Sequence, residues 1–205
     1  MRSVTSGLLV IFLLLSSGAQ AGDWRFGAGI NYVSGLSDVT DRFEKNYRNE
    51  YLVTEFDDLE IPIGLTFRTL FQADNGLRAD FGVGPTAFIF VSCDGACEDR
   101  SYLDFPVSAT IGYTFANSSS IAPYVRVGGV YHLAGGDYVD SSTPGIYAAA
   151  GVEFTRDRFI MWGFEVSIDT SEVDFEIIEP FSGTFQGRTE SINTSDVVAT
   201  IFMMF

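Results

Sequence analysis

The stretch from Leu59 to Phe71, LEIPIGLTFRTLF, decides the fold of this 205-residue chain. Large apolar side chains occupy nearly every second position, and glutamate, glycine, threonine and arginine fill most of the gaps. A period of two residues places successive side chains on opposite faces of a β-strand. The stretch therefore predicts a strand with one apolar face.

The same alternation recurs along the rest of the chain. It returns from Leu77 to Val91, and Asp74-Asn75-Gly76 between the two stretches predicts a hairpin turn. No helical period of comparable length competes with this pattern. We expect eight strands in all, the other six being Trp24 to Tyr32, Leu103 to Phe115, Ile121 to Leu133, Ile146 to Phe154, Ile160 to Ile168 and Val197 to Phe205.

The direction of the apolar faces separates two kinds of closed barrel. In a soluble barrel, the large side chains of all eight strands would crowd a lumen that has little room, and the exterior would be glycine, threonine, serine and a few charges. With the faces reversed, lipid meets the large apolar residues and the lumen holds the small and polar ones. The sequence therefore predicts an all-β fold, an eight-stranded antiparallel up-and-down transmembrane β-barrel.

The first 21 residues have the pattern of a cleaved secretory signal. Arg2 precedes an apolar run from Gly7 to Leu15, and small residues lead to Ala19-Gln20-Ala21. The run is shorter than the roughly 20 apolar residues that a spanning helix needs. We therefore expect a signal peptide at residues 1–21 and a single barrel domain at residues 22–205.

The connections between the expected strands alternate in length. Residues 72–76, 116–120 and 155–158 form short turns, whereas roughly 34–58, 92–102, 134–144 and 169–192 are long loops. Outer-membrane barrels have short periplasmic turns and longer external loops. This alternation predicts a protein of the bacterial outer membrane with both termini in the periplasm.

The formal net charge of −15 at pH 7 bears on partners. Such a chain would repel polyphosphates, which argues against nucleic-acid binding. Acidic residues gather in the first and last long loops, where divalent cations could bind them, yet no EF-hand pattern is present. We favour solvated charges that keep the loops soluble. Apolar residues among them indicate either strands that continue above the membrane or contact with a partner, these residues being Phe43, Tyr47, Phe175, Ile177, Ile178 and Phe181.

The last strand, Val197 to Phe205, carries a further resemblance. Its terminal Phe205 follows apolar residues at every second position. With the signal, the eight alternating strands and the loop asymmetry, the chain resembles the small outer-membrane β-barrel family typified by OmpA and OmpX. The resemblance implies that the barrel-assembly machinery reads Phe205 and that periplasmic chaperones escort the chain. It implies location and fold rather than an activity, and no peptidoglycan-binding domain is expected after the barrel.

Several charged residues fall on the lumen side of the expected strands. Buried charges are costly unless they are paired. Symmetric pairing about Asp74 places Arg68 opposite Asp80. We favour a structural network of ion pairs that fills the lumen over a gate for small ions, because an eight-stranded barrel leaves little open bore. The expected network comprises Arg25, Arg68, Arg78, Asp80, Arg126, Glu153 and Glu165.

The single histidine, His132, is expected in the lumen opposite Asp104, since both lie 14 residues from Ser118. A His-Asp pair could orient a general base. Some small outer-membrane barrels modify lipid A, but the deacylases among them carry His-x-Ser and this chain has His132-Leu133-Ala134. We favour a lumen-lining histidine without a catalytic role.

Cys93 and Cys97 are the only cysteines and enclose a turn-like stretch. In an exported protein they can oxidise, so we favour a small disulfide loop. A metal site would need further ligands, and none lies nearby in sequence. No metal or other cofactor is expected.

Three classes of function remain at this point. The first is a monomeric, non-enzymatic barrel with a structural or surface-interaction role through its acidic loops, in contact with outer-membrane lipid and lipopolysaccharide. The second is a narrow pore for ions or small solutes. The third is a lipid A-modifying enzyme.

Overall fold

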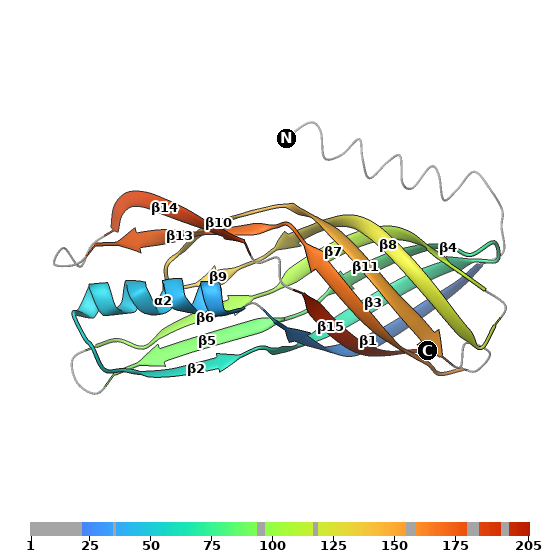
Figure 1. Cartoon of the computed structure of the whole chain (residues 1–205), viewed down its shortest axis with the longest axis horizontal. Coiled ribbons are helices and arrows are strands. Elements are labelled where there is room, and N and C mark those ends of the chain that lie inside the picture. The colour runs from blue at the N-terminus through green and yellow to red at the C-terminus, as the bar shows by residue number, and fades with distance from the viewer. Residues whose placement is uncertain are drawn as a thin grey trace.

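The computed structural model describes residues 22–34, 36–93, 97–116, 119–154, 159–179, 185–193 and 197–205. Within these residues eight strands close into an antiparallel barrel in the order β1-β15-β12-β11-β8-β7-β4-β3 (Figure 1). The fold class predicted from the sequence is thus confirmed, whereas the expected signal at residues 1–21 lies outside the described part. The barrel strands are β1 (Gly22–Val33), β3 (Ile63–Ala73), β4 (Leu77–Val83), β7 (Pro106–Thr114), β8 (Ile121–His132), β11 (Gly145–Phe154), β12 (Met161–Asp169) and β15 (Val198–Met204).

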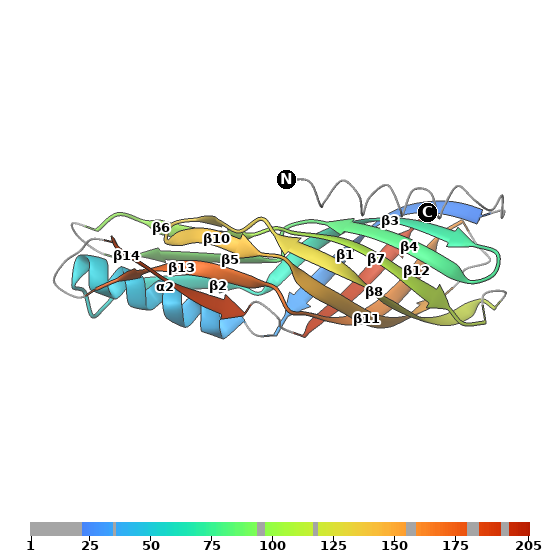
Figure 2. The same cartoon turned by 90° about the horizontal axis from the view of Figure 1, so that it is seen from above.

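Beyond one end of the barrel the chain builds a second layer of structure, which we call the outer module. It contains a helix and two small sheets, of order β2-β5-β6-β9 and β10-β13-β14. Figures 1 and 2 show these elements as a continuation of the barrel away from the C-terminus. The elements are α2 (Leu36–Tyr51), β2 (Asp57–Ile61), β5 (Ala87–Ser92), β6 (Arg100–Asp104), β9 (Gly135–Gly136), β10 (Val139–Thr143), β13 (Glu172–Ile178) and β14 (Phe185–Asn193).

Helix α2 corrects the expectation of an irregular acidic loop at residues 34–58 and of a chain without a competing helical period. Leu36, Val39, Phe43 and Tyr47 recur at the spacing of one helix face, and all four are buried. The acidic residues occupy mainly the opposite face. The many charged residues between 34 and 58 indicate a solvated loop, whereas the apolar residues between them follow a helical period.

Three of the expected long strands are each two strands in the structure. Residues 59–71 divide at Pro62 into β2 and β3, residues 77–91 divide at 84–86 into β4 and β5, and residues 103–115 divide at Phe105 into β6 and β7. Proline has no N–H to give to a strand ladder, which explains the break at Pro62 and the break around Pro85.

The break at residues 84–86 also reverses the side on which the apolar residues lie. Leu77 and Phe81 are exposed on the outer wall, whereas Ile89 and Val91 are buried in the outer module. A side chain at Gly84 would lie 2.2 Å from the carbonyl oxygen of Leu65, so the close contact between these chains requires glycine. The predicted single apolar face from Leu77 to Val91 is therefore wrong beyond Val83.

The core of the outer module lies between its two sheets and α2. Figure 1 shows α2 between β13 and β14 on one side and β5 and β2 on the other. Of the two origins expected for the apolar loop residues, the structure has strands that continue above the barrel and pack against this helix. The buried apolar cluster is Leu36, Val39, Phe43, Tyr47, Ala87, Ile89, Val91, Tyr102, Tyr138, Val173, Phe175 and Ile178.

Asn46 joins α2 to β13 through its buried carboxamide. Its Nδ2 donates to the carbonyl of Glu176 at 2.6 Å, and its Oδ1 accepts from the N–H of Ile178 at 3.2 Å. The β13–β14 register shifts between the same two residues. Asn46 thus supplies hydrogen-bond partners for two backbone groups of β13 at the point where its pairing with β14 is irregular.

Replacing Asn46 by alanine is expected to loosen the outer module while the barrel stays closed. The variant leaves a buried N–H and a buried carbonyl without partners, each at a cost of roughly 1–3 kcal/mol. Limited proteolysis of the folded protein should cut Asn46→Ala within the outer module faster than wild type. Asp41→Ala, at an exposed position of the same helix, is the control, and equal cleavage of both variants would contradict the role of Asn46.

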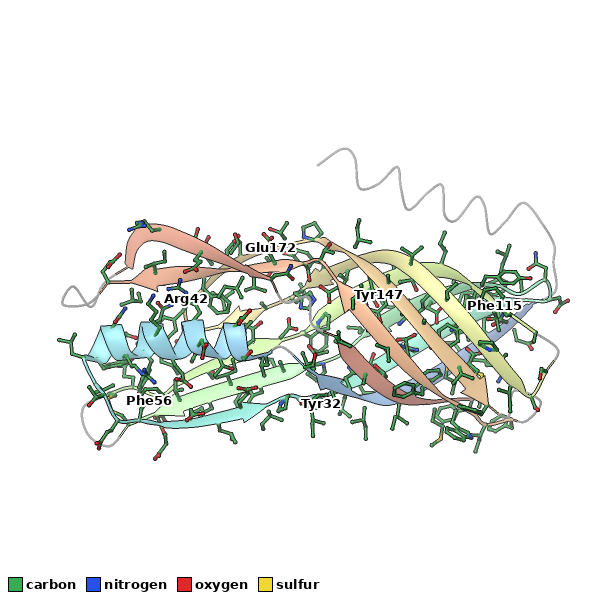
Figure 3. All side chains as sticks on the ribbon, in the orientation of Figure 1. Tyr32, Arg42, Phe56, Phe115, Tyr147 and Glu172 are labelled. Atoms are coloured by element: carbon green, nitrogen blue, oxygen red, sulfur yellow. A yellow bond between two sulfur atoms is a disulfide. The ribbon has the colours of Figure 1, made fainter. Side chains whose placement is uncertain are left out.

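The outer wall of the barrel is lined by large apolar side chains. Ile111 is 60% exposed and Ile201 is 63% exposed, and Figure 3 shows side chains projecting outward around the barrel strands. Tyr32 and Phe115 lie toward opposite ends of this wall (Figure 3). Across the described residues, no helix combines the length and apolar character needed to cross a membrane.

Candidate functional site: a charged lumen and the cavity above it

Six charged residues from five strands meet inside the barrel. Alternation places one side chain in two on the lumen side of a strand, and these six positions are in that phase. Each of the six is at most 5% exposed. They are Arg68 on β3, Arg78 and Asp80 on β4, Arg126 on β8, Glu153 on β11 and Glu165 on β12.

Glu165 is the centre of the first half of this network. Its carboxylate accepts from Arg68 Nη2, and from Nε and Nη2 of Arg126 at 2.7 Å each. The hydroxyl of Tyr124 donates to it at 2.7 Å. One carboxylate therefore accepts hydrogen bonds from two guanidinium groups on β3 and β8, which are not neighbours in the barrel.

Arg78 is the centre of the second half. Two of its nitrogens donate to the two oxygens of Asp80 at 2.8 Å each, and Nη1 donates to Glu153 at 2.7 Å. The guanidinium also lies 3.8 Å from the centroid of the Tyr124 ring. Three arginines and three acids give the network a formal charge of 3 − 3 = 0.

The predicted register of the first hairpin is wrong by two residues. Arg68 lies opposite Gly82, and Asp80 lies opposite Leu70, because the pairing is symmetric about Asn75 rather than Asp74. The N–H of Gly76 closes this turn on the carbonyl of Ala73 at 3.0 Å. Arg68 consequently pairs with Glu165, and Asp80 pairs with Arg78.

Arg25, the seventh residue expected in the network, lies on β1 opposite Leu70. Its side chain is half-buried near the end of the barrel that holds the 72–76 turn. Its burial is thus less complete than that of the six central residues.

The structure places His132 and Asp104 in contact above this network. His132 Nδ1 lies 2.8 Å from both carboxylate oxygens of Asp104. In the backbone His132 lies opposite Pro106 rather than Asp104, so the predicted register is again two residues off, and the irregularity at Phe105 brings the carboxylate back. On the other side of the ring, Nε2 lies 3.6 Å from Oδ2 of Asp169.

A small cavity is lined by residues of both groups of charges. Its volume is about 70 Å³. Arg68 and Arg126 of the network line it, and so do Asp104, His132 and Asp169. Arg68 Nη1 and His132 Nε2 are both buried and have no hydrogen-bond partner among the described atoms. The cavity can hold water or a very small polar solute.

The cluster around His132 lacks the geometry of a nucleophilic catalyst. Two hydroxyls lie close by, but Ser171 donates to Asp169 at 2.5 Å and Thr86 donates to Asp104 at 2.7 Å. Neither is hydrogen bonded to the imidazole of His132. A base activates a nucleophile through a direct hydrogen bond, which no described hydroxyl makes with His132. Among the described residues, no group of three or more potential ligands is arranged to hold a metal ion.

The sequence-based prediction of the lumen missed Tyr124 and Asp169. Tyr124 is in phase with Arg126 on β8, and Asp169 is in phase with Glu165 on β12. Both could have been found by continuing the count of every second residue. A search for charged residues within the apolar stretches finds neither of them, because Tyr124 is aromatic and Asp169 lies at the end of its strand.

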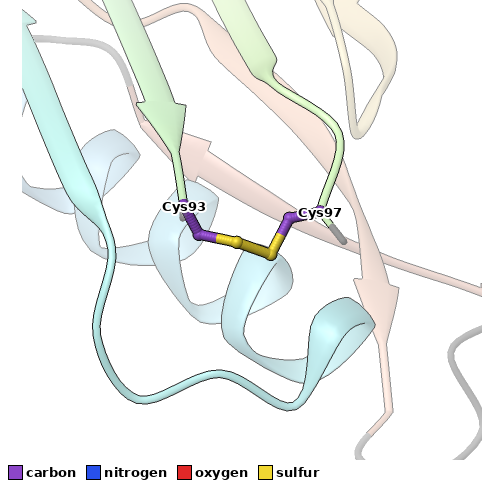
Figure 4. The surroundings of a disulfide bond; sticks show 2 residues. All are labelled: Cys93 and Cys97. Carbon is purple, nitrogen blue, oxygen red and sulfur yellow. A yellow bond between two sulfur atoms is a disulfide. The ribbon is translucent and has the colours of Figure 1, made fainter. Parts of the chain in front are cut away.

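Cys93 and Cys97 lie at the far end of the outer module, where they form a disulfide between β5 and β6 (Figure 4). Their Cα atoms are 5.9 Å apart. Both residues pack against the apolar cluster of the module. The bridge therefore ties the β5–β6 connection to the module rather than to the barrel.

Replacing both cysteines by serine is expected to affect the module and to leave the barrel intact. A loop this short gives a chain-entropy effect of about 2 kcal/mol. Hydrogen exchange should show faster opening of β5 and β6 in the double variant, with unchanged exchange in β8 and β11. Equal acceleration in all four strands would contradict a local role.

The tip of α2 is held by a second cluster of charges. Arg100 Nη2 donates to Glu50 Oε1 at 2.6 Å, and Arg100 Nη1 lies 3.4 Å from Asp137. The hydroxyl of Tyr138 also donates to Glu50. The hydrogen bond with Glu50 holds the pKa of Arg100 above its usual range, and burial raises the pKa of Tyr138. Arg100 is thus charged and Tyr138 neutral at any physiological pH.

Arg42 joins the other face of α2 to β14. It forms an ion pair with Glu190, and Figure 3 shows Arg42 on the side of the helix toward β13 and β14. Several acidic residues expected in solvated loops thus hold the module together. Phe181 lies outside the described residues.

The terminal Phe205 closes the last strand against the first. Its N–H and carbonyl both bond to Phe26 at 2.9 Å, and its side chain is 52% exposed on the outer wall. The described chain ends and the 72–76 turn lie at the same end of the barrel, opposite the outer module. The role of Phe205 as an assembly signal stays a prediction.

Comparisons with known proteins support the fold. No family model and no curated protein sequence matches the chain. Among solved structures, the chain is similar to the outer membrane protein OprG from Pseudomonas aeruginosa, with 12% identity, a TM-score of 0.56, and coverage of 92% of this chain and 98% of that one. It also matches the outer membrane protein AlkL in lipid bilayers, with 16% identity, a TM-score of 0.41, and coverage of 92% and 89%. The likeness to OprG is one of fold, an eight-stranded barrel, and the narrower resemblance to OmpA and OmpX stays a prediction.

Proposed function

We propose that this protein is an integral outer-membrane barrel with a sealed lumen, and that its role is structural or one of surface interaction through the outer module. The observation that carries the proposal is the buried lumen network. Its charges are paired across five strands, which locks the wall and fills the bore. An eight-stranded barrel has little room for a channel beside such a network.

The outer wall supports a location in lipid. Charged side chains point into the lumen while leucine, isoleucine, valine and aromatic residues cover the exterior. Trp24, Tyr32, Tyr113, Phe115, Tyr131 and Phe205 near the strand ends suit the two interfacial belts. We place the short turns and both termini in the periplasm and the outer module at the cell surface, in contact with lipopolysaccharide. Export through a signal at residues 1–21, assembly through Phe205 and a monomeric state belong to the same proposal.

A narrow pore is the second candidate. The cavity above the network favours it, because a space lined by Arg68 and His132, whose Nη1 and Nε2 have no hydrogen-bond partner among the described atoms, could accept a small solute from outside. A route through the membrane would also require the ion pairs of Glu165 and Arg78 to open. The lipid A-modifying enzyme ranks third, since no described hydroxyl is hydrogen bonded to His132.

Conductance in planar bilayers distinguishes the sealed barrel from the pore. We expect wild-type protein to give no resolved steps above the leak of the bilayer, with a general porin inserted under the same conditions as a positive control. Arg68→Gln provides the second arm. Resolved wild-type steps that change in size with Arg68→Gln would favour the pore and overturn the sealed lumen.

A further inference from the structure

The two sheets of the outer module have outer faces of opposite character. In the β2-β5-β6-β9 sheet, the residues that alternate with the buried Ile89 and Val91 point away from the core. Backbone pairing places Leu59 beside Phe90, Ile61 beside Phe88, and Phe88 beside Leu103. Leu59, Ile61 and Leu103 are 52%, 37% and 43% exposed, and the two phenylalanines are half-buried. We call Leu59, Ile61, Phe88, Phe90 and Leu103 the apolar sheet face.

The described side chains of the β10-β13-β14 sheet form no corresponding apolar face. Its outward residues include Asp174, which accepts from Ser141 at 2.6 Å and from Ser191 at 2.5 Å. Glu176 lies beside Thr189 in the same sheet. These hydroxyls lower the pKa of Asp174, which keeps its carboxylate ionised at neutral pH. The outer face of the β10-β13-β14 sheet is therefore suited to contact with water, and the apolar sheet face is not.

The apolar sheet face continues the outer wall of the barrel. β2 leads through Pro62 into β3, so Leu59 and Ile61 are in phase with the exposed Ile63 and Leu65. Hydrogen bonds cross the boundary, from Leu65 N–H to Pro85 at 2.7 Å and from Thr86 N–H to Asp104 at 3.0 Å. Figures 1 and 2 show β2 and β5 running on from β3 and β4. Leu59, Ile61, Ile63 and Leu65 form one continuous apolar row along β2 and β3, and Pro62 and Gly64 lie in the opposite phase.

The apolar surface is consequently taller on this side of the molecule. From Phe71 to Leu59 the chain advances 12 residues, or about 30 Å along the barrel axis at the usual rise and tilt, against an apolar band of about 25 Å in outer-membrane barrels. On β12, the stretch from Trp162 to Ile168 spans about 15 Å by the same estimate. The exposed carboxylates of Asp57 and Asp58 mark the upper limit of the tall side.

We propose that the apolar sheet face lies against the lipid of the outer leaflet. The outer module then contacts the membrane through its β2-β5-β6-β9 sheet and exposes its β10-β13-β14 sheet to the medium. The proposal rests on the proposed function, because it extends the lipid-facing wall of the barrel by one sheet. Continuity with that wall favours lipid as the occupant over a second copy of the chain. It assigns different neighbours to the two sheets and identifies the polar one as the surface that a soluble partner would meet.

Spin labels on single introduced cysteines test this assignment. The native cysteines are bonded to each other, so labelling without reductant is specific for the introduced residue. Leu59→Cys and Leu103→Cys report on the apolar sheet face, Thr189→Cys on the polar sheet, and Ile111→Cys on the barrel wall. Each labelled protein is placed in phosphatidylcholine vesicles, and collision rates with oxygen and with a water-soluble nickel chelate are measured.

We expect the labels at Leu59 and Leu103 to resemble the one at Ile111, with severalfold more collisions with oxygen than with nickel, and the label at Thr189 to show the reverse. Nickel access at Leu59 and Leu103 with protection at Ile111 would overturn this inference and leave the barrel proposal standing. Nickel access at Ile111 as well would overturn both. Spin–spin broadening at Leu59 that disappears on dilution with unlabelled protein would show that a second copy covers the face, which also overturns contact with lipid.

Discussion

Glu165→Gln is expected to destabilise the folded barrel more than any other single substitution of a lumen residue. The carboxylate is fully buried and serves Arg68, Arg126 and the hydroxyl of Tyr124. The neutral amide leaves two buried guanidinium groups without a counter-charge, at a cost of about 3–5 kcal/mol. Urea unfolding of protein in lipid vesicles, followed by the gel mobility of the folded form, measures the change in free energy.

Glu179→Gln is the matched control for this substitution. Its partner Arg188 is 69% exposed, and an exposed pair contributes about 1 kcal/mol or less. If Glu165→Gln fails to fold, the double variant Arg68→Met, Glu165→Gln removes one charge of each sign and keeps the network neutral, at 2 − 2 = 0. Recovery of folding in the double variant would assign the loss to uncompensated charge, and a loss for Glu165→Gln no greater than that for Glu179→Gln would contradict the role of the network.

Phe43→Ala is expected to unfold the outer module without opening the barrel. The ring is fully buried, and its centroid lies 5.1 Å from that of Tyr138 and 6.5 Å from that of Tyr102. Truncation of a buried phenylalanine costs about 3–5 kcal/mol through lost contacts and the cavity left behind. Trypsin should then cut at Lys45 and Arg48, which the folded helix protects, while the unboiled protein keeps its folded mobility.

Leu52→Ala provides the control at an exposed position just after α2. It should leave the trypsin pattern of the wild type unchanged. Loss of folded mobility in Phe43→Ala would show that the module and the barrel unfold as one unit, which contradicts their separate cores. The structure places one apolar cluster in the module and another, around Leu70 and Tyr124, inside the barrel.

The barrel could be predicted because its strands repeat one simple signal. In Ile121 to His132 every second residue faces out, and the lumen positions Tyr124, Arg126 and His132 follow from counting alone. The ion pairs were harder to predict, because a hairpin symmetric about Asn75 instead of Asp74 moves every partner by two residues. The pairing of Arg68 with Glu165 joins strands far apart in sequence, and no local pattern specifies it.

The outer module was harder to predict, because its many charged residues mask the helical spacing of the apolar ones. Between Leu36 and Tyr51 the acidic and basic residues resemble a solvated loop, and only the spacing of Val39, Phe43 and Tyr47 indicates the helix. The reversal of faces after Gly84 could not be read from the alternation, because a strand break leaves the period intact and changes which side is buried. The contact between His132 and Asp104 was expected from a register that is itself wrong, and the irregularity at Phe105 compensates for the error.

The central claim, an apolar wall in lipid around a polar lumen, is tested most directly by the gel mobility of the protein from purified outer membranes, with and without boiling. We expect the protein in the outer-membrane fraction, with an unboiled form that migrates as a compact species and a boiled form that migrates below the 22.5 kDa of the full chain, because residues 1–21 are removed on export. Protein recovered from the soluble periplasmic fraction, with identical mobility before and after boiling, would contradict the claim.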